Sequence, residues 1–457
     1  MDYAATTPLD SRVLSEMTPY FSEHYGNPSS VHGFGETAQK GLIEARRLTA
    51  NFLNADTNEI IFTSGATEGN NTAIKGIAGS KKIWEERGGR PHIIVSDIEH
   101  DCVLESAKRV GKDGLAEVSF APIGPDGRVD VSKLTELIRP NTALISVMYA
   151  NNETGVIQPV ADIGRIIADI NKERKNKIYF HVDAAQAVNY LDCDTKKLGV
   201  DLMTLSAHKI YGPKGVGALY VRKGTPIAPF MNGGEQEFHI RAGTHNVPGI
   251  IGLGKAISMV GEYAEANEKI TALRDKLIDG ILAAVPRSFL NGSRDYRLPN
   301  NANIRFEGAE GEAILIMLNE EGIAVSTGSA CAAKSLSPSH VLKAMGLSDL
   351  DAHSSIRFSL GRGTTEEDVN CTLAVISGII KKLREVSGSF DSTDSTNSSQ
   401  AKSAQINSSE KEEQSAQKQT VFWDDSEIDR GGLPADLGCE KNRKPEAIGE
   451  DDEHLGF

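Results

Sequence analysis

The stretch that decides the fold is KIYFHVDAAQAVNYLDCDTKKLGVDLMTLSAHKIYGPKGVGALYVR, residues 177–222. It holds three short apolar runs, which cover 177–182, 200–205 and 216–222. Runs that are apolar almost throughout are typical of strands buried on both faces. Asp183 follows the first run and Lys209 the second, and the carboxyl ends of such strands are where parallel sheets bind ligands. The 26 residues from one to the other allow a single crossover between parallel strands, so both side chains can reach one site.

The same alternation of strands and helices extends toward the N-terminus. Further candidate strands are 59–63, 92–96, 116–120 and 142–149. Helical segments such as 38–53 and 158–172 lie between several of them. In the first of these segments one helical face carries Leu42, Ala45, Leu48 and Phe52. The pattern predicts an α/β domain built on a mostly parallel sheet.

A different pattern begins near residue 250 and predicts a smaller α+β domain. A long helical stretch continues to about 284. Strands are expected at 302–306, 323–327 and 354–359, and helices at 311–321 and 366–384. We expect a large domain over 12–252 and a small domain formed by 1–11 and 253–387.

The net charge of −14 is unevenly distributed. Residues 388–457 hold 16 acidic and 7 basic residues, so this tail carries −9 of the total. Its first part, 389–409, contains eight Ser and almost no large apolar side chain, which predicts disorder. The remaining body is close to neutral. The net charge of −14 argues against direct binding of nucleic acid or of an anionic membrane.

Five cysteines, an odd number without a CxxC pair, indicate a reducing compartment with neither a disulfide framework nor a zinc site. No apolar run approaches the ~20 residues of a membrane span. With no presequence before the first motif, the expected location is the cytoplasm. The mitochondrial matrix is the alternative if residues are missing before Met1.

Lys209 and Asp183 each have two interpretations. A lysine at the end of a buried strand can form an imine with a carbonyl cofactor, or it can be an ordinary surface lysine. A carboxylate at the depth of Asp183 is costly unless it meets a cation such as a pyridinium nitrogen, although it could also cap the next turn.

Three more loops follow predicted strands. In FTSGATEGNN (62–71) the turn at Ala66 and Thr67 precedes a helix, whose free N–H groups suit a phosphate unless Thr67 or Glu68 caps them. His100 could stack on a flat ring and exchange protons, or it could be a structural histidine. Asn152 is an amide at a loop end or a turn residue.

Together these segments resemble the cysteine desulfurases, the NifS/IscS-like branch of the class V aminotransferase family, which are fold-type I enzymes dependent on pyridoxal 5′-phosphate. The resemblance covers about residues 2–387. It rests on DYAATTPLD (2–10), GNPSSVH (26–32), GATE, NNETG, HVDAAQ, SAHKIYGPKG, STGSACAAKSLSPSHVLKAMG (326–346) and HSSIRFSLGRGTTEED (353–368).

The resemblance implies a role for each of these residues. Lys209 would hold the cofactor, Asp183 would pair with its pyridinium nitrogen, and His100 would stack on its ring and transfer protons. Gln186 and Asn152 would contact the phenolic oxygen side of the ring or the substrate. Arg357 would grip the substrate carboxylate.

The resemblance also implies a phosphate site shared between subunits. Its members would be Ala66, Thr67, Ser206 and His208, with Thr244 reaching in from a second subunit. A site completed in this way implies an obligate homodimer.

Cys331 is the most informative cysteine, because it lies in a Gly/Ser/Ala-rich loop, although a free cysteine is most often a small buried hydrophobe. In the family its thiolate attacks the sulfur of bound L-cysteine, which leaves L-alanine and an enzyme persulfide. The other four cysteines are expected to be structural or incidental. The sulfur acceptor would be an iron–sulfur scaffold or a tRNA-thiolation protein.

Other functions remain open at this point. A selenocysteine lyase or another C–S lyase would share the fold. An aminotransferase would leave Cys331 without a role, and a catalytically silent scaffold would leave Lys209 and Asp183 without one. Two departures also stand out. Phe238 replaces an Arg that many relatives carry, and the acidic tail replaces the family's scaffold-binding segment, so scaffold binding does not follow.

Overall fold

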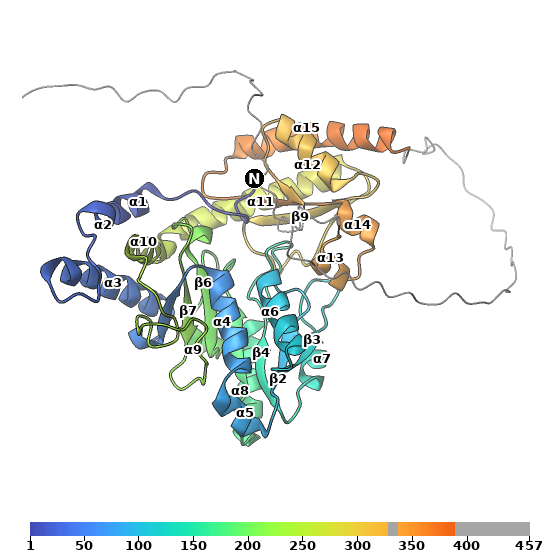
Figure 1. Ribbon diagram of the computed structural model, residues 1–457. Helices are drawn as coiled ribbons and strands as arrows, with labels where there is room; N and C mark the ends of the chain where they lie inside the picture. The colour runs from blue at the N-terminus through green and yellow to red at the C-terminus, as the bar shows by residue number, and fades with distance from the viewer. Residues whose placement is uncertain (328–336, 389–457) are drawn as a thin grey trace, which may run out of the picture. The chain divides into compact units, whose positions relative to one another are not determined.

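The computed structural model describes residues 1–327 and 337–388 (Figure 1). They belong to a compact unit that extends over Met1–Ser392. Cys331 and the predicted disordered stretch 389–409 lie outside the described residues. The division into domains at residues 12 and 252 stays an interpretation.

A seven-stranded sheet carries most of the chain. Its order is β1 (Ile60–Thr63), β7 (Gly217–Val221), β6 (Leu202–Ser206), β5 (Tyr179–Asp183), β4 (Thr142–Ser146), β2 (His92–Ser96) and β3 (Glu117–Ala121). The strand pairs from β6 to β3 are parallel, and only β7 runs antiparallel to its neighbours. The predicted strands and the mostly parallel sheet are therefore confirmed.

Helices cover both faces of this sheet because its strands are apolar on both sides. Phe180 and Val182 share a core with α1 (Ser11–Met17), α3 (Gly33–Phe52), α8 (Val160–Glu173) and α10 (Val247–Ser258). Tyr179, with the opposite orientation, shares a second core with α4 (Ala66–Ala78), α5 (Lys81–Arg87) and α6 (Asp101–Lys112). Figure 1 shows α4 and α6 in front of the strands. Short helices complete this part: α2 (Pro19–Ser22), α7 (Val131–Glu136) and α9 (Thr195–Leu198).

A second, antiparallel sheet has the order β10 (Ser326–Thr327), β11 (Ser355–Ser359), β9 (Asn301–Phe306) and β8 (Ser288–Leu290). Its apolar face packs against α11 (Ala264–Ala284), α12 (Gly311–Glu320) and α15 (Glu366–Val386). The alternate residues of β9 and β11, among them Asn303, Ser355 and Arg357, are polar. The helical stretch expected from residue 250 to 284 is in fact two helices, separated by the 3₁₀ turn Val260–Tyr263.

Two short helices lie between the sheets. These are α13 (His340–Ala344) and α14 (Asp349–His353), and their apolar side chains form a small cluster with Ile98 and Met148. Since those two residues follow β2 and β4, the cluster lies at the carboxyl ends of the large sheet. None of the helices in the described ranges is long and apolar enough to cross a membrane.

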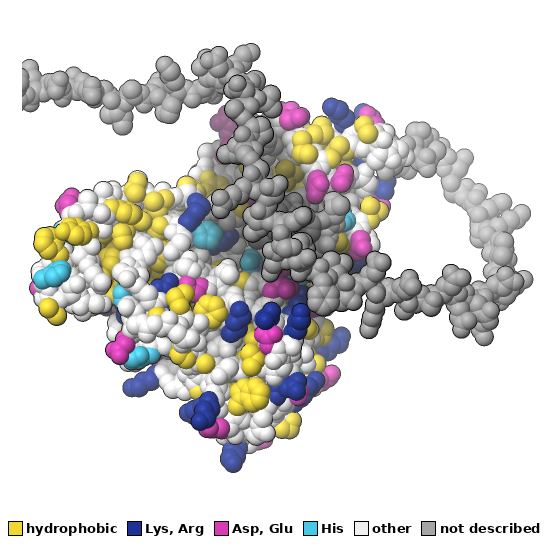
Figure 2. All heavy atoms as spheres, viewed as in Figure 1, with side chains coloured by type: hydrophobic (Ala, Val, Ile, Leu, Met, Phe, Trp, Pro, Cys, Tyr) yellow, Lys and Arg dark blue, Asp and Glu magenta, His cyan; other side chains and the backbone are white. Residues whose placement is uncertain are grey.

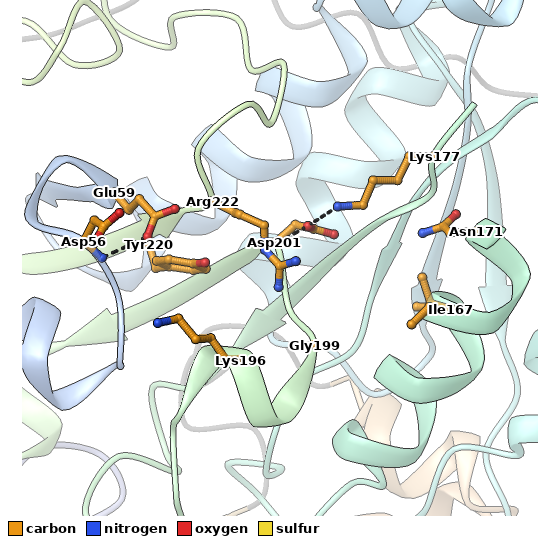
Figure 3. A pocket seen from close by; sticks show the side chains of 11 residues that line it. Asp56, Glu59, Ile167, Asn171, Lys177, Lys196, Gly199, Asp201, Tyr220 and Arg222 are labelled. Carbon is orange, nitrogen blue, oxygen red and sulfur yellow. Dashed lines mark hydrogen bonds and ion pairs between the residues drawn. The ribbon is translucent and has the colours of Figure 1, made fainter. Parts of the chain in front are cut away.

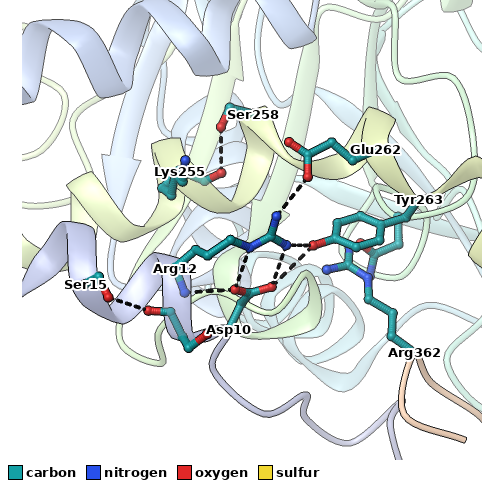
Figure 4. A network of polar contacts seen from close by, with 10 residues as sticks. Asp10, Arg12, Ser15, Lys255, Ser258, Glu262, Tyr263 and Arg362 are labelled. Atoms are coloured by element: carbon teal, nitrogen blue, oxygen red, sulfur yellow. Dashed lines mark hydrogen bonds and ion pairs between the residues drawn. The ribbon is translucent and has the colours of Figure 1, made fainter.

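The N-terminal segment links the two sheets. The backbone N–H of Tyr3 donates to Ser359 of β11, and further along the N–H groups of Thr7 and Asp10 donate to the carbonyls of His208 and Tyr211. The segment then ends at α1, where Asp10 caps the helix. Figure 4 shows the Asp10 carboxylate against the guanidinium of Arg12, which also reaches Glu262 and Tyr263. These contacts fix the segment beside the Lys209 loop.

Candidate active site

A cavity of about 1080 Å³ lies at the carboxyl ends of the parallel strands. Its walls are the loops after β1, β2, β4, β5 and β6, the N-terminal residues Ala4–Thr6, and residues of the smaller sheet and of α13. Ten of the twelve predicted site residues line it: Ala66, Thr67, His100, Asn152, Asp183, Gln186, Ser206, His208, Lys209 and Arg357. The rule that parallel sheets bind ligands at the carboxyl ends of their strands therefore predicted where these side chains meet.

Lys209 ends a 3₁₀ turn directly after β6. Its Nζ donates to the carbonyl oxygens of Ala4 at 2.5 Å and Ala5 at 2.8 Å, while its own carbonyl accepts from Asn189 Nδ2 at 2.8 Å. Tyr211, two residues on, has a φ of 63°, an unusual conformation for a bulky residue. The amine therefore reaches the cavity from a tightly constrained turn.

Asp183, the last residue of β5, is only 5% exposed. Oδ1 accepts from the backbone N–H of Ala185 at 2.9 Å, and Oδ2 accepts from Asn70 Nδ2 at 2.6 Å. Among the described residues no Lys, Arg or His forms an ion pair with this carboxylate. A buried carboxylate without a cation is costly, so the site suits a ligand that brings a positive charge, such as a protonated pyridine ring.

The N-terminus of α4 faces the same cavity. Its N-cap, Gly65, has a φ of 151° and no side-chain cap, so neither Thr67 nor another side chain covers the end of the helix. Glu68 is turned aside, because its carboxylate accepts from the backbone N–H of Ser64 at 2.9 Å and pairs with Arg241 at 3.0 Å. The N–H groups of the first turn, with the positive end of the helix dipole, suit a phosphate.

Ser206 and His208 border this helix end from β6. Burial, and then the charges of Lys209 and Lys214, lower the pKa of His208 to about 4. His208 is therefore neutral near pH 7 and offers a hydrogen bond rather than a charge. Its Nδ1 lies 3.2 Å from Thr6 Oγ1.

Arg357 projects from the polar face of β11 and is 2% exposed. Its Nη1 donates to the carbonyl of Asn152, and its Nη2 pairs with Asp2, each at 2.9 Å. Its buried Nε has no hydrogen-bond partner among the described residues. A guanidinium with unused N–H groups at a cavity wall suits a carboxylate ligand. Gln186, which also lines the cavity, donates to the carbonyl of Ala4 at 3.1 Å.

Two buried glutamates beside the cavity carry no signal that sequence reasoning could use. Burial raises the pKa of Glu99 to about 8, although its Oε1 accepts from Ser96 Oγ and from the N–H of Met148, each at 2.6 Å. Burial likewise raises the pKa of Glu153 to about 7, with Ser339 Oγ donating to it. Both carboxyl groups are therefore substantially protonated near neutral pH.

Cys102 and Asn70 are a second pair that the sequence does not single out. Cys102 is expected from sequence to be incidental, but it lines the cavity and its Sγ lies 3.1 Å from His100 Nδ1. Asn70, on α4, contacts both Cys102 and Asp183. The expectation that Cys102 is structural or incidental stays a prediction. Cys193 is buried and Cys371 is exposed, both outside the cavity lining.

Two predicted site residues are not brought together with the others. Thr244 is exposed and does not line the cavity of its own chain. Its predicted role in a partner subunit stays a prediction. Cys331 lies outside the described residues.

A second cavity, of about 480 Å³, lies near the amino ends of β5 and β6 (Figure 3). Three of its charged groups pair with one another: Asp201 accepts from Lys177 at 2.7 Å and lies 3.3 Å from Arg222 Nε. None of the predicted site residues lines it. The residues suited to chemistry therefore converge on the first cavity.

Comparisons with known proteins agree with this geometry. The aminotransferase class-V family model matches residues 1–371. A cysteine desulfurase IscS from Methanosarcina thermophila is 48% identical over 388 residues, which are 85% of this chain and 93% of the relative. The IscS of Dictyoglomus turgidum is also 48% identical, over 85% of this chain and 95% of its own length.

Solved structures give the same result. A NifS-like protein superposes with a TM-score of 0.76 at 39% identity, over 84% of this chain and 99% of its own. SspA in complex with cysteine has a TM-score of 0.69 at 38% identity, over 80% and 99% of the two chains. The expected fold-type I architecture and the expected cofactor are confirmed. This chain belongs to the class-V aminotransferase family, in its branch of pyridoxal phosphate-dependent cysteine desulfurases.

Proposed function

We propose that this protein converts L-cysteine to L-alanine and transfers the sulfur to Cys331 as a persulfide. The observation that carries the proposal is the convergence on one cavity of Lys209, the unpaired buried carboxylate of Asp183, and Arg357. The relatives named cysteine desulfurase, and a related structure with cysteine bound, support the choice of substrate.

The residues of the cavity fit pyridoxal phosphate. When bound, this cofactor supplies an electron sink for negative charge at the substrate Cα. Lys209 would attach it covalently, and Asp183 would pair with the ring nitrogen and keep it protonated. The N-terminus of α4 at Ala66 and Thr67, together with Ser206, would hold the phosphate. Neutral His208 would add a hydrogen bond.

The remaining side chains would act on the substrate. Arg357 would bind its carboxylate, since its guanidinium lies at the cavity wall. Gln186 and Asn152 would orient the amine and the ring oxygen. Lys209, once released, would move the proton from Cα, and His100 would stack on the ring and take part in the later proton transfers.

Cys331 would receive the sulfur. Its thiolate attacks the substrate Sγ, an S–S bond forms, and the Cβ–Sγ bond breaks. The electron pair of the broken bond passes to the carbon fragment, which is protonated and leaves as alanine. No external oxidant is needed, because the bound substrate accepts the electrons. The persulfide sulfur would then pass to an iron–sulfur scaffold or a tRNA-thiolation protein, in the cytoplasm.

A homodimer would complete the site. Large exposed apolar side chains gather over α1, α2 and α3 (Figure 2). They are Leu14, Phe21, Tyr25, Val31, Phe34 and Ile43. Such a patch is typical of a protein interface. The exposure of Thr244 is compatible with a contact to the phosphate of a partner subunit.

The test is turnover of L-cysteine by the purified protein loaded with pyridoxal phosphate. We expect equal amounts of alanine and transferred sulfur, and no product from Lys209→Ala. Comparing the rates with cysteine and with selenocysteine separates a desulfurase from a selenocysteine lyase. Absence of alanine from the loaded wild-type protein would overturn the proposal.

A further inference from the structure

We propose that Cys102 positions the imidazole of His100 and favours its tautomer protonated at Nε2. Together with Asn70, Cys102 also connects His100 to Asp183 through hydrogen bonds. The proposal depends on the proposed function only for the roles of Asp183 and His100 toward the cofactor. The hydrogen-bond geometry that carries it stands independently of any activity.

The tautomer follows from the cap of α6. His100 is the N-cap residue, and its Nδ1 accepts from the backbone N–H of Cys102 at 3.1 Å. A backbone amide can only donate, so Nδ1 carries a lone pair and the ring proton of neutral His100 is on Nε2. The local helix start therefore already favours one of the two tautomers.

The thiol of Cys102 adds a second donor to the same nitrogen. Its Sγ lies 3.1 Å from His100 Nδ1, which is within hydrogen-bond reach of sulfur. Since Nδ1 has no proton to give, the S–H must be the donor in this contact. One residue thus contributes both its N–H and its S–H to His100.

Asn70 fixes the direction of the thiol proton from the other side. This amide is fully buried, and its Nδ2 donates to Asp183 Oδ2 at 2.6 Å and to Cys102 Sγ at 3.1 Å. The reverse orientation would set the amide oxygen against the carboxylate of Asp183. Because Asn70 donates to the sulfur, the thiol proton is left for His100.

The amide oxygen of Asn70 supports this orientation. Oδ1 is buried and has no partner in the described part of the chain. Because the amide oxygen makes no hydrogen bond, the orientation of the Asn70 side chain is set by the groups that its nitrogen binds, the carboxylate and the thiol. The result is a continuous polar chain, Asp183–Asn70–Cys102–His100, from the group that would face the ring nitrogen to the group that would lie on the ring.

Replacing the thiol has a defined consequence. In Cys102→Ala, Nδ1 keeps only the backbone donor. The tautomer protonated at Nε2 is then favoured less strongly, and protonation at Nδ1 becomes easier. Cys102→Ser keeps a hydroxyl that can donate to Nδ1, so it should restore the wild-type state. Cys371→Ala is the matched control, because Cys371 is an exposed cysteine on α15.

The experiment is ¹⁵N NMR of histidine-labelled holoenzyme, with the His100 signals assigned through His100→Gln. We expect a protonated Nε2 and an unprotonated Nδ1 in the wild type, in Cys102→Ser and in Cys371→Ala. In Cys102→Ala the two nitrogen signals should shift toward each other, because the second tautomer becomes more populated. The acidic limb of the pH–kcat profile should also move up by about 0.5–1 pH unit in Cys102→Ala alone, as for the loss of one hydrogen bond.

Three results would overturn the proposal: a proton on Nδ1 in the wild type, an unchanged tautomer and pH profile in Cys102→Ala, or Cys102→Ser behaving like Cys102→Ala. Failure of the proposed function looks different. The NMR signature would then be present in a protein that releases no alanine from cysteine.

Discussion

Glu99 lets the electrostatics of the site be tested through stability alone. It is fully buried and accepts hydrogen bonds from Ser96 and Met148, and burial raises the pKa of its side chain from 4.5 to about 8. Between these two pH values the native protein keeps a proton that the unfolded chain has lost. The free energy of unfolding therefore falls as pH rises through this window.

The size of the effect follows from the width of the window. One pKa unit corresponds to about 1.4 kcal/mol. The raised pKa of Glu99 therefore lowers the free energy of unfolding by about 3 kcal/mol at pH 7 and by about 4–5 kcal/mol at pH 8. In Glu99→Gln the amide oxygen can still accept from Ser96 and Met148. The new N–H₂ takes the place of Oε2, which has no partner within residues 1–327 and 337–388, at a pH-independent cost of about 1–3 kcal/mol.

The assay is urea unfolding of wild type and Glu99→Gln at fixed subunit concentration and without added cofactor, from pH 5 to pH 8. We expect the stability of the variant relative to wild type to rise by about 3–4 kcal/mol across this range. Glu16→Gln, on the exposed surface of α1, is the control and should follow wild type. A constant difference between Glu99→Gln and wild type would refute the reasoning.

Three further predictions concern binding. Asp183→Asn removes the charge opposite the ring nitrogen, so affinity for pyridoxal phosphate in an absorbance titration should fall about 10- to 150-fold, as for one charged hydrogen bond of about 1.5–3 kcal/mol; unchanged affinity would contradict the fit. Arg357→Lys loses the planar two-point grip, so KM for cysteine should rise at least about 10-fold with a smaller change in kcat; the reverse pattern would place Arg357 elsewhere in the reaction. The pKa of Glu153 is raised to about 7, so its ionisation near that pH adds a negative charge beside Arg357. The KM of the wild type for cysteine should therefore rise with pH through 7 relative to the KM of Glu153→Gln. Parallel plots of KM against pH for the two proteins would exclude this coupling.

The strands and the positions where they end could be predicted because the apolar runs that mark them are local in the sequence. The apolar runs before Asp183 and Lys209 needed no tertiary information, and the rule for parallel sheets then brought both to one cavity. Strand β8, three residues long, was missed because so short a run has no periodicity. The break at Val260–Tyr263 was missed because Gly261 is a weak stop signal within an otherwise helical pattern.

Contacts between elements could not be predicted in the same way. Asn70 and Cys102 are 32 residues apart and meet only because α4 and α6 pack side by side on one face of the sheet. The raised pKa values of Glu99 and Glu153 depend on complete burial, which neither local sequence reveals. The site was therefore predictable residue by residue at the loop ends, while its supporting polar network was not.

The central claim is that cysteine sulfur passes to Cys331. The most direct measurement is mass spectrometry of the holoenzyme after a single turnover with L-cysteine, with alanine quantified in the same sample. The account predicts one alanine per site and the added mass of one sulfur atom on the peptide that contains Cys331, and neither in Cys331→Ala. Alanine formation without sulfur on that peptide, or with the sulfur on Cys102 instead, would contradict it.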